Sequence, residues 1–411
     1  MKKTLAAVAV LTAFAGSAFA AEVTVYGRID AGFAFENYEA TNQKGEQVAD
    51  ENDLSMDSGL MSTNRLGFKG SEKISEDLEV GFVLETKIVG DTGEAFTDGF
   101  GRESLVYAKT DYGTIYAGVV GTMWSDGGST NFFASNYIAG GSGGGRYTLP
   151  GYNLMAAAGG REGNRISYVS PTFAGFTLYG EYSFGIQEAG ENTAKADRPA
   201  AIGLKYANGP FGAGMVVSYT NEASNGSNAR NNDREDELTV NLGAHYDAGI
   251  ADFKLAGQYF KGSNAIGNVT GLLEDSDALA GFEYKNKDDE KVTKDFFDMY
   301  DDLKGYGIVA GADIPAWGGE WTISVAYTDA ESEDSTTSYT FADDAGKVSH
   351  DMPKVDLKGY SAGVMYAYPL SKQTVIKAGV GYIKVEAESA DWTHTAEYEN
   401  FNAVVGLLKY F

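Results

Sequence analysis

Apolar and polar side chains alternate along most of this chain. Successive side chains of a β-strand point to opposite faces, so a period of two predicts strands with one apolar and one polar face. In residues 22–36 the odd-numbered positions carry Val23, Val25, Gly27, Ile29, Ala31, Phe33 and Phe35. The even-numbered positions of that segment include Glu22, Thr24, Arg28, Asp30 and Glu36. We therefore expect an all-β fold.

About sixteen segments show this alternation, an even number that suits a closed antiparallel barrel. The predicted strands cover residues 22–36, 62–70, 78–89, 102–110, 114–123, 164–170, 175–185, 199–207, 211–220, 236–247, 251–261, 303–313, 320–330, 356–368, 374–386 and 397–411. Eight strands fill a barrel with their own side chains, whereas sixteen leave an aqueous channel. The count therefore predicts a transmembrane barrel with a water-filled lumen.

The predicted connections are of two lengths. Very short turns lie at residues 111–113, 208–210, 247–249 and 369–373. Long polar links lie at residues 37–61, 124–163, 262–302 and 331–355. Long loops on one side and short turns on the other are typical of outer-membrane barrels.

A soluble β-sandwich would also alternate, with its apolar face turned inward. Two observations favour the barrel. The apolar face of many segments carries aromatic residues, as expected at a membrane interface: Tyr182, Tyr219, Tyr246, Tyr259, Tyr327, Tyr368 and Tyr382. The opposite face is rich in Gly, Ser, Thr, Asn and charged residues, which suits a wet lumen. In lipid, a closed sheet also pairs every backbone group without leaving an edge.

The first twenty residues have the features of a secretory signal. Lys2 and Lys3 precede an apolar run from Leu5 to Phe14, and residues 18–20 read Ala-Phe-Ala, a cleavage pattern. The run is too short to span a bilayer as a helix. We expect a signal peptide at residues 1–20 and a single barrel domain at residues 21–411.

Composition excludes several classes of function. The net charge of −26 disfavours nucleic acid, whose binding depends on Lys and Arg. The absence of Cys removes thiolate metal sites and Cys nucleophiles, and three His are few for a zinc centre. We expect no metal, no cofactor and no nucleic-acid partner.

Several short motifs occur in an order that is specific to one family. They are Val25-Tyr26-Gly27-Arg28-Ile29-Asp30 in the first predicted strand, residues 64–72 (NRLGFKGSE), residues 164–171 (NRISYVSP) and residues 368–374 (YPLSKQT). Together they span nearly the whole chain after the signal. The chain resembles the general diffusion porins of Gram-negative bacteria, and the β-proteobacterial branch in particular.

The resemblance implies a homotrimer of sixteen-stranded barrels in the outer membrane, in contact with lipid and lipopolysaccharide. It also implies that the third long loop folds into the lumen and narrows it, so that acidic loop residues face basic wall residues. The implied wall residues are Arg28, Arg65, Lys69, Arg102 and Arg165. The implied charges of the constriction loop are Asp126, Arg146, Arg161 and Glu162.

These inferences predict passive diffusion of ions and small hydrophilic solutes, without catalysis. Three alternatives stay open: a channel selective for one substrate class, a membrane-embedded barrel enzyme, and a soluble secreted β-sandwich. An enzyme would need a Ser partner for His245, the only His within a clear predicted strand. Glu79, Glu85 and Lys87 share the lumen face of one predicted strand, which favours a wall salt bridge over a catalytic pair of carboxylates.

Overall fold

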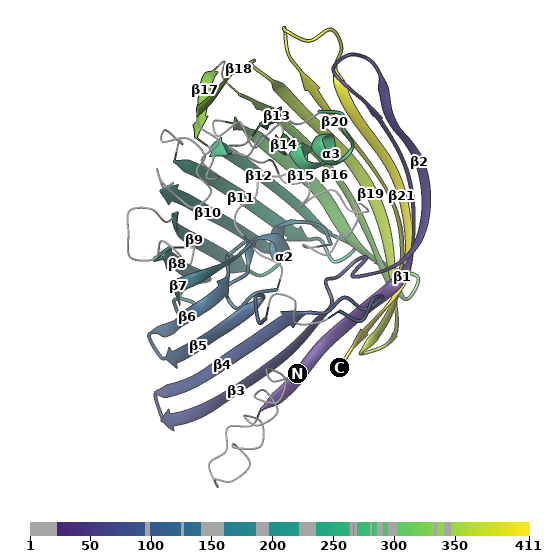
Figure 1. Cartoon of the computed structure of the whole chain (residues 1–411). Coiled ribbons are helices and arrows are strands. Elements are labelled where there is room, and N and C mark those ends of the chain that lie inside the picture. The colour runs from purple at the N-terminus through teal and green to yellow at the C-terminus, as the bar shows by residue number, and fades with distance from the viewer. Residues whose placement is uncertain are drawn as a thin grey trace.

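The strands of the protein close into a barrel (Figure 1). The computed structural model describes residues 23–94, 99–124, 127–140, 160–185, 197–221, 236–263, 266, 269–279, 282–285, 291–294, 303–332, 335–340 and 347–411. The predicted signal peptide at residues 1–20 lies outside the described residues.

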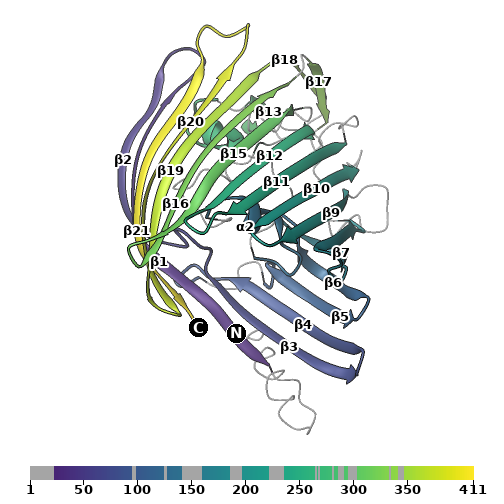
Figure 2. The ribbon, with the colours of Figure 1, turned by 180° about the vertical axis from the view of Figure 1, so that it is seen from behind.

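Sixteen strands form the wall, and every neighbouring pair is antiparallel. They are β1 (Thr24–Thr41), β3 (Arg65–Ser75), β4 (Leu78–Lys87), β5 (Glu103–Thr110), β6 (Gly113–Gly121), β7 (Arg161–Val169), β8 (Phe176–Ser183), β9 (Arg198–Asn208), β10 (Phe211–Asn221), β11 (Glu237–Asp247), β12 (Asp252–Ser263), β15 (Leu303–Ala316), β16 (Gly319–Glu331), β19 (Asp356–Ser371), β20 (Thr374–Glu388) and β21 (Ala396–Tyr410). The ring closes where β1 pairs with β21, the first strand with the last (Figure 2). The predicted closed sixteen-stranded antiparallel barrel is confirmed.

One strand of the large sheet was not predicted. The sequence placed residues 37–61 in a polar link, but residues Gln47–Ser58 form β2, which pairs with the upper part of β1 from Ala31 to Thr41. β3 pairs with the lower part, from Thr24 to Arg28. The large sheet therefore has seventeen strands, of which β2 extends one side of the wall beyond the ring. Its acidic residues concealed the alternation of Val48, Leu54 and Met56.

The outer face of the wall is apolar, as predicted. Phe33, Leu242 and Val405 are 55%, 57% and 48% exposed, although each lies within a regular strand. Tyr246, Tyr259, Tyr382 and other predicted interface residues are exposed on the same face. Such a surface is stable against hydrocarbon but costly in water, so the outer face meets lipid.

The inner face is polar over part of its height only. Toward the ends that carry the long connections, the inward side chains of β12, β15, β16 and β19–β21 are apolar and buried. A short helix, α3 (Val269–Asp275), covers them from inside the barrel (Figure 1). The sequence had predicted a wet polar lumen and a polar link at residues 262–302, so both expectations were wrong for this region.

Two further segments shape the inner wall. The link between β2 and β3 turns into the barrel, where Met61 N donates to Asp30 Oδ2 at 2.9 Å and Asp30 N donates to Asn64 Oδ1 at 2.6 Å. The connection after β6 carries the helix α2 (Phe133–Tyr137).

Two small hairpins belong to other long connections. They are β13 (Phe282–Lys285) with β14 (Lys291–Lys294), and β17 (Ser335–Thr340) with β18 (Lys347–Met352). Among the described residues, no helix has the length and apolar character needed to cross a membrane.

Candidate functional site: the constriction of the lumen

The connection between β6 and β7 folds into the barrel and packs through aromatic side chains. Trp124 and Phe133 stack with ring centroids 4.7 Å apart, and Phe132 stacks on Tyr179 of the β8 wall at 4.4 Å. Tyr137 contacts the edge of Phe133 at 5.4 Å. The four side chains Trp124, Phe132, Phe133 and Tyr137 are fully buried, and they belong to one apolar cluster with inward residues of the wall.

Glycines of the wall make room for these rings. A Cβ atom at Gly203 would lie 2.3 Å from Met123 Sδ, and one at Gly214 would lie 2.3 Å from Tyr137 Cε2. A Cβ atom at Gly243 would lie 2.6 Å from both Cβ and Cγ of Tyr137, which cannot rotate away. Glycine within a strand commonly marks a close approach of another group. Here glycines on β9, β10 and β11 form the surface on which the loop docks.

The far end of the described loop is held by Asp313 on β15. Gly140 N donates to Asp313 Oδ1 at 3.1 Å, and Thr322 Oγ1 donates to the same oxygen at 2.7 Å. Lys254 Nζ lies 2.8 Å from Asp313 Oδ2. One wall carboxylate thus joins the loop to two neighbouring strands.

Two wall carboxylates hold the near part of the loop. Ser129 donates its backbone N–H to Glu103 Oε1 at 2.6 Å and its hydroxyl to Glu103 Oε2 at 2.9 Å. Thr130 Oγ1 donates to Glu181 Oε1 at 2.8 Å. The described loop thus presents N–H and O–H donors to acidic wall residues, whereas Asp126, the acidic loop residue predicted to face the basic wall, lies outside the described residues.

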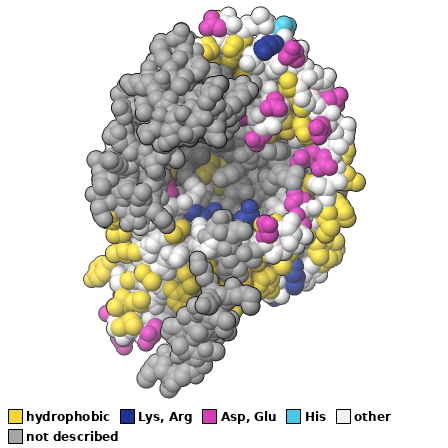
Figure 3. Space-filling model, viewed as in Figure 1, with side chains coloured by type: hydrophobic (Ala, Val, Ile, Leu, Met, Phe, Trp, Pro, Cys, Tyr) yellow, Lys and Arg dark blue, Asp and Glu magenta, His cyan; other side chains and the backbone are white. Residues whose placement is uncertain are grey.

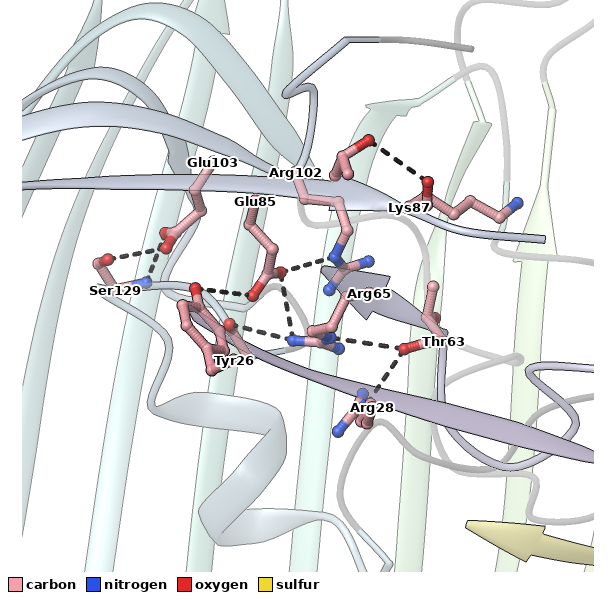
Figure 4. A network of polar contacts seen from close by, with 11 residues as sticks. Tyr26, Arg28, Thr63, Arg65, Glu85, Lys87, Arg102, Glu103 and Ser129 are labelled. Carbon is pink, nitrogen blue, oxygen red and sulfur yellow. Dashed lines mark hydrogen bonds and ion pairs between the residues drawn. The ribbon is translucent and has the colours of Figure 1, made fainter. Parts of the chain in front are cut away.

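Wall arginines surround a third carboxylate, Glu85 (Figure 4). Arg102 Nε donates to Glu85 Oε1 at 2.7 Å, and Arg65 Nη1 lies 3.4 Å from the same oxygen. Tyr26 OH donates to Glu85 Oε2 at 3.1 Å. Charged hydrogen bonds of this kind fix side chains more firmly than neutral ones. The expected wall salt bridge at Glu85 is present, with partners on neighbouring segments.

A recess of about 370 Å³ opens between this network and the loop. Its lining residues are Tyr26, Gly27, Arg28, Arg65, Lys69, Val83, Glu85, Glu103, Gly127, Gly128, Ser129 and Tyr410. Lys69 Nζ lies over the Tyr26 ring, 5.2 Å from its centroid, and the Lys69 side chain is exposed to the lumen. Arg28 Nε donates to Thr63 O at 3.1 Å. Figure 3 shows Lys and Arg side chains at the lower edge of the hollow on this face.

The structure brings four of the five predicted wall residues together. Arg28, Arg65 and Lys69 line the recess, and Arg102 joins them through Glu85. Arg165 lies on β7, further round the wall, where it forms ion pairs with Glu181 and with Glu162.

Of the four charged residues predicted for the constriction loop, two lie in the wall and two lie outside the described residues. Arg161 and Glu162 belong to β7, which begins at Arg161, so they are wall residues and their assignment to the loop was wrong. The reason is that β7 starts three residues earlier than its alternation indicated. Asp126 and Arg146 lie outside the described residues.

Sequence reasoning missed Glu103, Glu181 and Asp313, which hold the loop. Their inward direction followed from parity, because each shares the lumen face with its neighbours two residues away. The binding partner of each carboxylate did not follow from parity, because that partner lies in a loop distant in sequence.

A match to a family model decides the classification. The model described as Gram-negative porin matches residues 7–388 of the chain. The chain belongs to this family. It is an outer-membrane β-barrel, and its lumen serves as a diffusion channel.

Individual relatives agree with this assignment. Outer membrane porin protein 32 of Delftia acidovorans is 26% identical over 392 residues, which cover 93% of this chain and 90% of the relative. An outer membrane porin protein of Bordetella pertussis is 30% identical over 285 residues, with coverage of 62% of this chain and 69% of the relative. The solved anion-selective porin from Comamonas acidovorans has the same fold, with a TM-score of 0.60 and 21% identity over 95% of this chain and all of that one.

Proposed function

We propose that this porin is a water-filled channel that favours small anionic and neutral hydrophilic solutes, with its selectivity set at the recess beside the constriction loop. The observation that carries the proposal is the excess of positive charge at the recess. Three basic residues, Arg28, Arg65 and Lys69, line it, against the two carboxylates of Glu85 and Glu103.

The whole-chain charge of −26 has the opposite sign, but its influence at the recess is limited. Charges in water are screened over about 8 Å at physiological salt, and much of the acid lies in the long connections. A passing ion therefore responds chiefly to the charges that line the narrowest part. The anion-selective porin from Comamonas acidovorans, which shares the fold, supports the same sign.

The test is the reversal potential of single channels in a planar bilayer under a salt gradient. Replacing Arg28 and Arg65 together by Gln should shift the potential toward cation selectivity, because two positive charges leave the recess. Lys384→Gln is a control, since Lys384 lies on the outward side of β20, between Glu386 and Glu399. An unchanged potential in the double variant would remove these arginines from the selectivity site.

We also propose a homotrimer, supported by the trimer form of OmpT of Vibrio cholerae, a solved protein of the same fold with a TM-score of 0.54. Conductance steps in groups of three, or a trimer by mass measurement in detergent, would test it. Removal of residues 1–20 is a further prediction, checked by sequencing the N-terminus of the mature protein.

Transport is proposed as the whole activity, without catalysis. His245, the candidate base of an enzymatic barrel, has its Nδ1 atom 2.9 Å from Asp252 Oδ1 and its ring beside Tyr137. These contacts give it a structural role in the wall under the loop. Outer-membrane lipid and lipopolysaccharide are the expected surroundings of the exposed apolar face.

A further inference from the structure

Part of the inner wall is built to be covered. Toward the extracellular ends of β12, β15, β19 and β20, the inward side chains are aliphatic or aromatic and almost completely buried. They include Phe260, Val309, Leu357, Val385 and Ala387. Side chains of this kind facing an aqueous vestibule would expose apolar surface to water, which is unfavourable. Their burial shows that other apolar groups cover them.

The α3 segment, which we define as Ile266 with residues 269–279, supplies part of that cover and contacts β20 and β21. Ile266, Val269 and Leu273 are fully buried against this wall, and Leu272 is 6% exposed. Residues 269, 272, 273 and 276 fall on one side of a helix, so the segment is amphipathic despite its short length. Ser276 Oγ donates to Leu272 O at 2.7 Å, and Leu279 N donates to Leu273 O at 2.9 Å, which folds the end of the segment back on the helix.

The other side of α3 is turned away from the wall. Gly271, Glu274 and Asp275 lie there, and Asp275 is exposed. Apart from Gly271 itself, its chain neighbours and the helix backbone, no atom in the described part of the chain lies within 4 Å of the position that a Cβ of Gly271 would take. This side of the helix is therefore the more exposed one among the described residues.

The α3 segment and the constriction loop occupy different parts of the lumen. The α2 helix contacts β10, β11 and β12, whereas α3 contacts β20 and β21. The basic recess involves β1, β3, β4 and β5, on a further part of the wall. An obstacle on one side of the vestibule directs solutes toward the sides that remain open.

We propose that the α3 segment is a second restriction of the channel. It is held on the apolar wall above the constriction loop, and it borders the solute pathway with Gly271 and Asp275. It limits the size of solutes that reach the basic recess. The proposal rests on the chain conducting as an open porin, which the conductance of the unmodified protein tests separately.

The first test releases the segment. Leu273→Asp places a carboxylate in the apolar contact, and a buried unpaired charge is strongly unfavourable, so the segment should leave the wall. Single-channel conductance should rise, and liposome swelling should extend to larger neutral sugars. Ala390→Asp is the matched control, because Ala390 is exposed in the turn between β20 and β21. A folded Leu273→Asp barrel with unchanged conductance and unchanged sugar cut-off would overturn the proposal.

The second test leaves the segment in place, so that it is informative even where Leu273→Asp fails to fold. The chain has no cysteine, and a single thiol can therefore be introduced without background. Gly271→Cys should react with bulky methanethiosulfonate reagents of either charge, and single-channel conductance should then fall as the pathway narrows.

Gly180→Cys is the matched control for this measurement. Gly180 lies on the outward side of β8, opposite Ile202, where a reagent cannot reach the lumen. Its conductance should not change after exposure to the reagent. A Gly271→Cys thiol that is labelled completely, as shown by mass measurement, without a fall in conductance would overturn the proposal. A thiol that does not react would overturn it as well, because the face would then be covered.

Discussion

The two helical segments inside the barrel are held by opposite means. The constriction loop, which carries α2, places aromatic rings against glycines of the wall, and its polar groups bind Glu103, Glu181 and Asp313. The α3 segment rests aliphatic side chains on an aliphatic wall. The first contact depends on close fit of shape and on buried charge, whereas the second depends mainly on the area removed from water.

This difference predicts which substitutions each contact tolerates. A glycine contact fails when a single methyl group is added, because the ring has no space to move into. An aliphatic contact accepts changes of shape that preserve volume, but it weakens when volume is lost. Each prediction below tests one side of this comparison.

The largest effect is expected from loss of a buried charge on the wall that holds the constriction loop. Glu181 binds Arg165 and Thr130, and its side chain is 2% exposed. Glu181→Gln should lower the free energy of unfolding by about 3 to 5 kcal/mol, because breaking a buried ion pair leaves the charge of Arg165 only partly compensated. Denaturant unfolding in detergent measures this change.

The control for that variant is Glu399→Gln. Glu399 Oε1 lies 2.9 Å from Lys384 Nζ, but its side chain is 43% exposed. Removing a pair of this kind should cost about 1 kcal/mol or less. Equal losses of unfolding free energy in the two variants would show that burial of the ion pair between Glu181 and Arg165 adds nothing to stability.

The next effect concerns the α3 contact. Leu273→Ala should lower the free energy of unfolding by about 2 to 5 kcal/mol, because it leaves a cavity in the apolar layer. Leu273→Met keeps the volume and should cost less than about 1.5 kcal/mol. Unfolding curves of both variants would show the dependence on volume. If Leu273→Met lost more unfolding free energy than Leu273→Ala, the contact would depend on side-chain shape and not on volume.

A smaller change in stability is expected at the glycine contact, together with a change in transport. Gly243→Val should cost about 1 to 3 kcal/mol by overpacking against Tyr137. The loop should shift from the wall, and single-channel conductance should change. Gly257→Val on the outward side of β12 has room, since the nearest described atom is Gly307 O at 3.8 Å, and it should leave conductance unaltered. The same conductance in both variants would argue against docking at Gly243.

The smallest effect is expected at Lys69, which lies in open contact with the recess. Lys69→Gln should reduce anion preference slightly, whereas Lys69→Arg should preserve it by keeping the charge over Tyr26. The difference should be larger at 0.1 M salt than at 1 M, because the screening length falls from about 10 Å to about 3 Å. Reversal potentials at the two salt concentrations measure it, and a difference independent of salt would contradict an electrostatic origin.

The amino-acid sequence alone determined the barrel. Alternation from Val23 onward predicted strands, their even number predicted closure, and parity placed Arg28, Arg65 and Lys69 on the lumen face. These features are local or periodic, because the direction of a side chain in a strand depends only on its position along that strand. The resemblance of short motifs added the family and a loop that folds inward.

The tertiary structure decided what each inward side chain meets. The position of a residue along its strand tells whether its side chain faces the lumen or the lipid. It does not tell at what height of the wall the side chain lies, or which segment packs against it. Gly243 became a docking point because Tyr137, more than a hundred residues earlier in the chain, packs on it. The inward Val385 and Leu357 lie in a dry layer because α3 covers them. Such contacts join residues distant in sequence, and their partners are fixed only when the sheet closes.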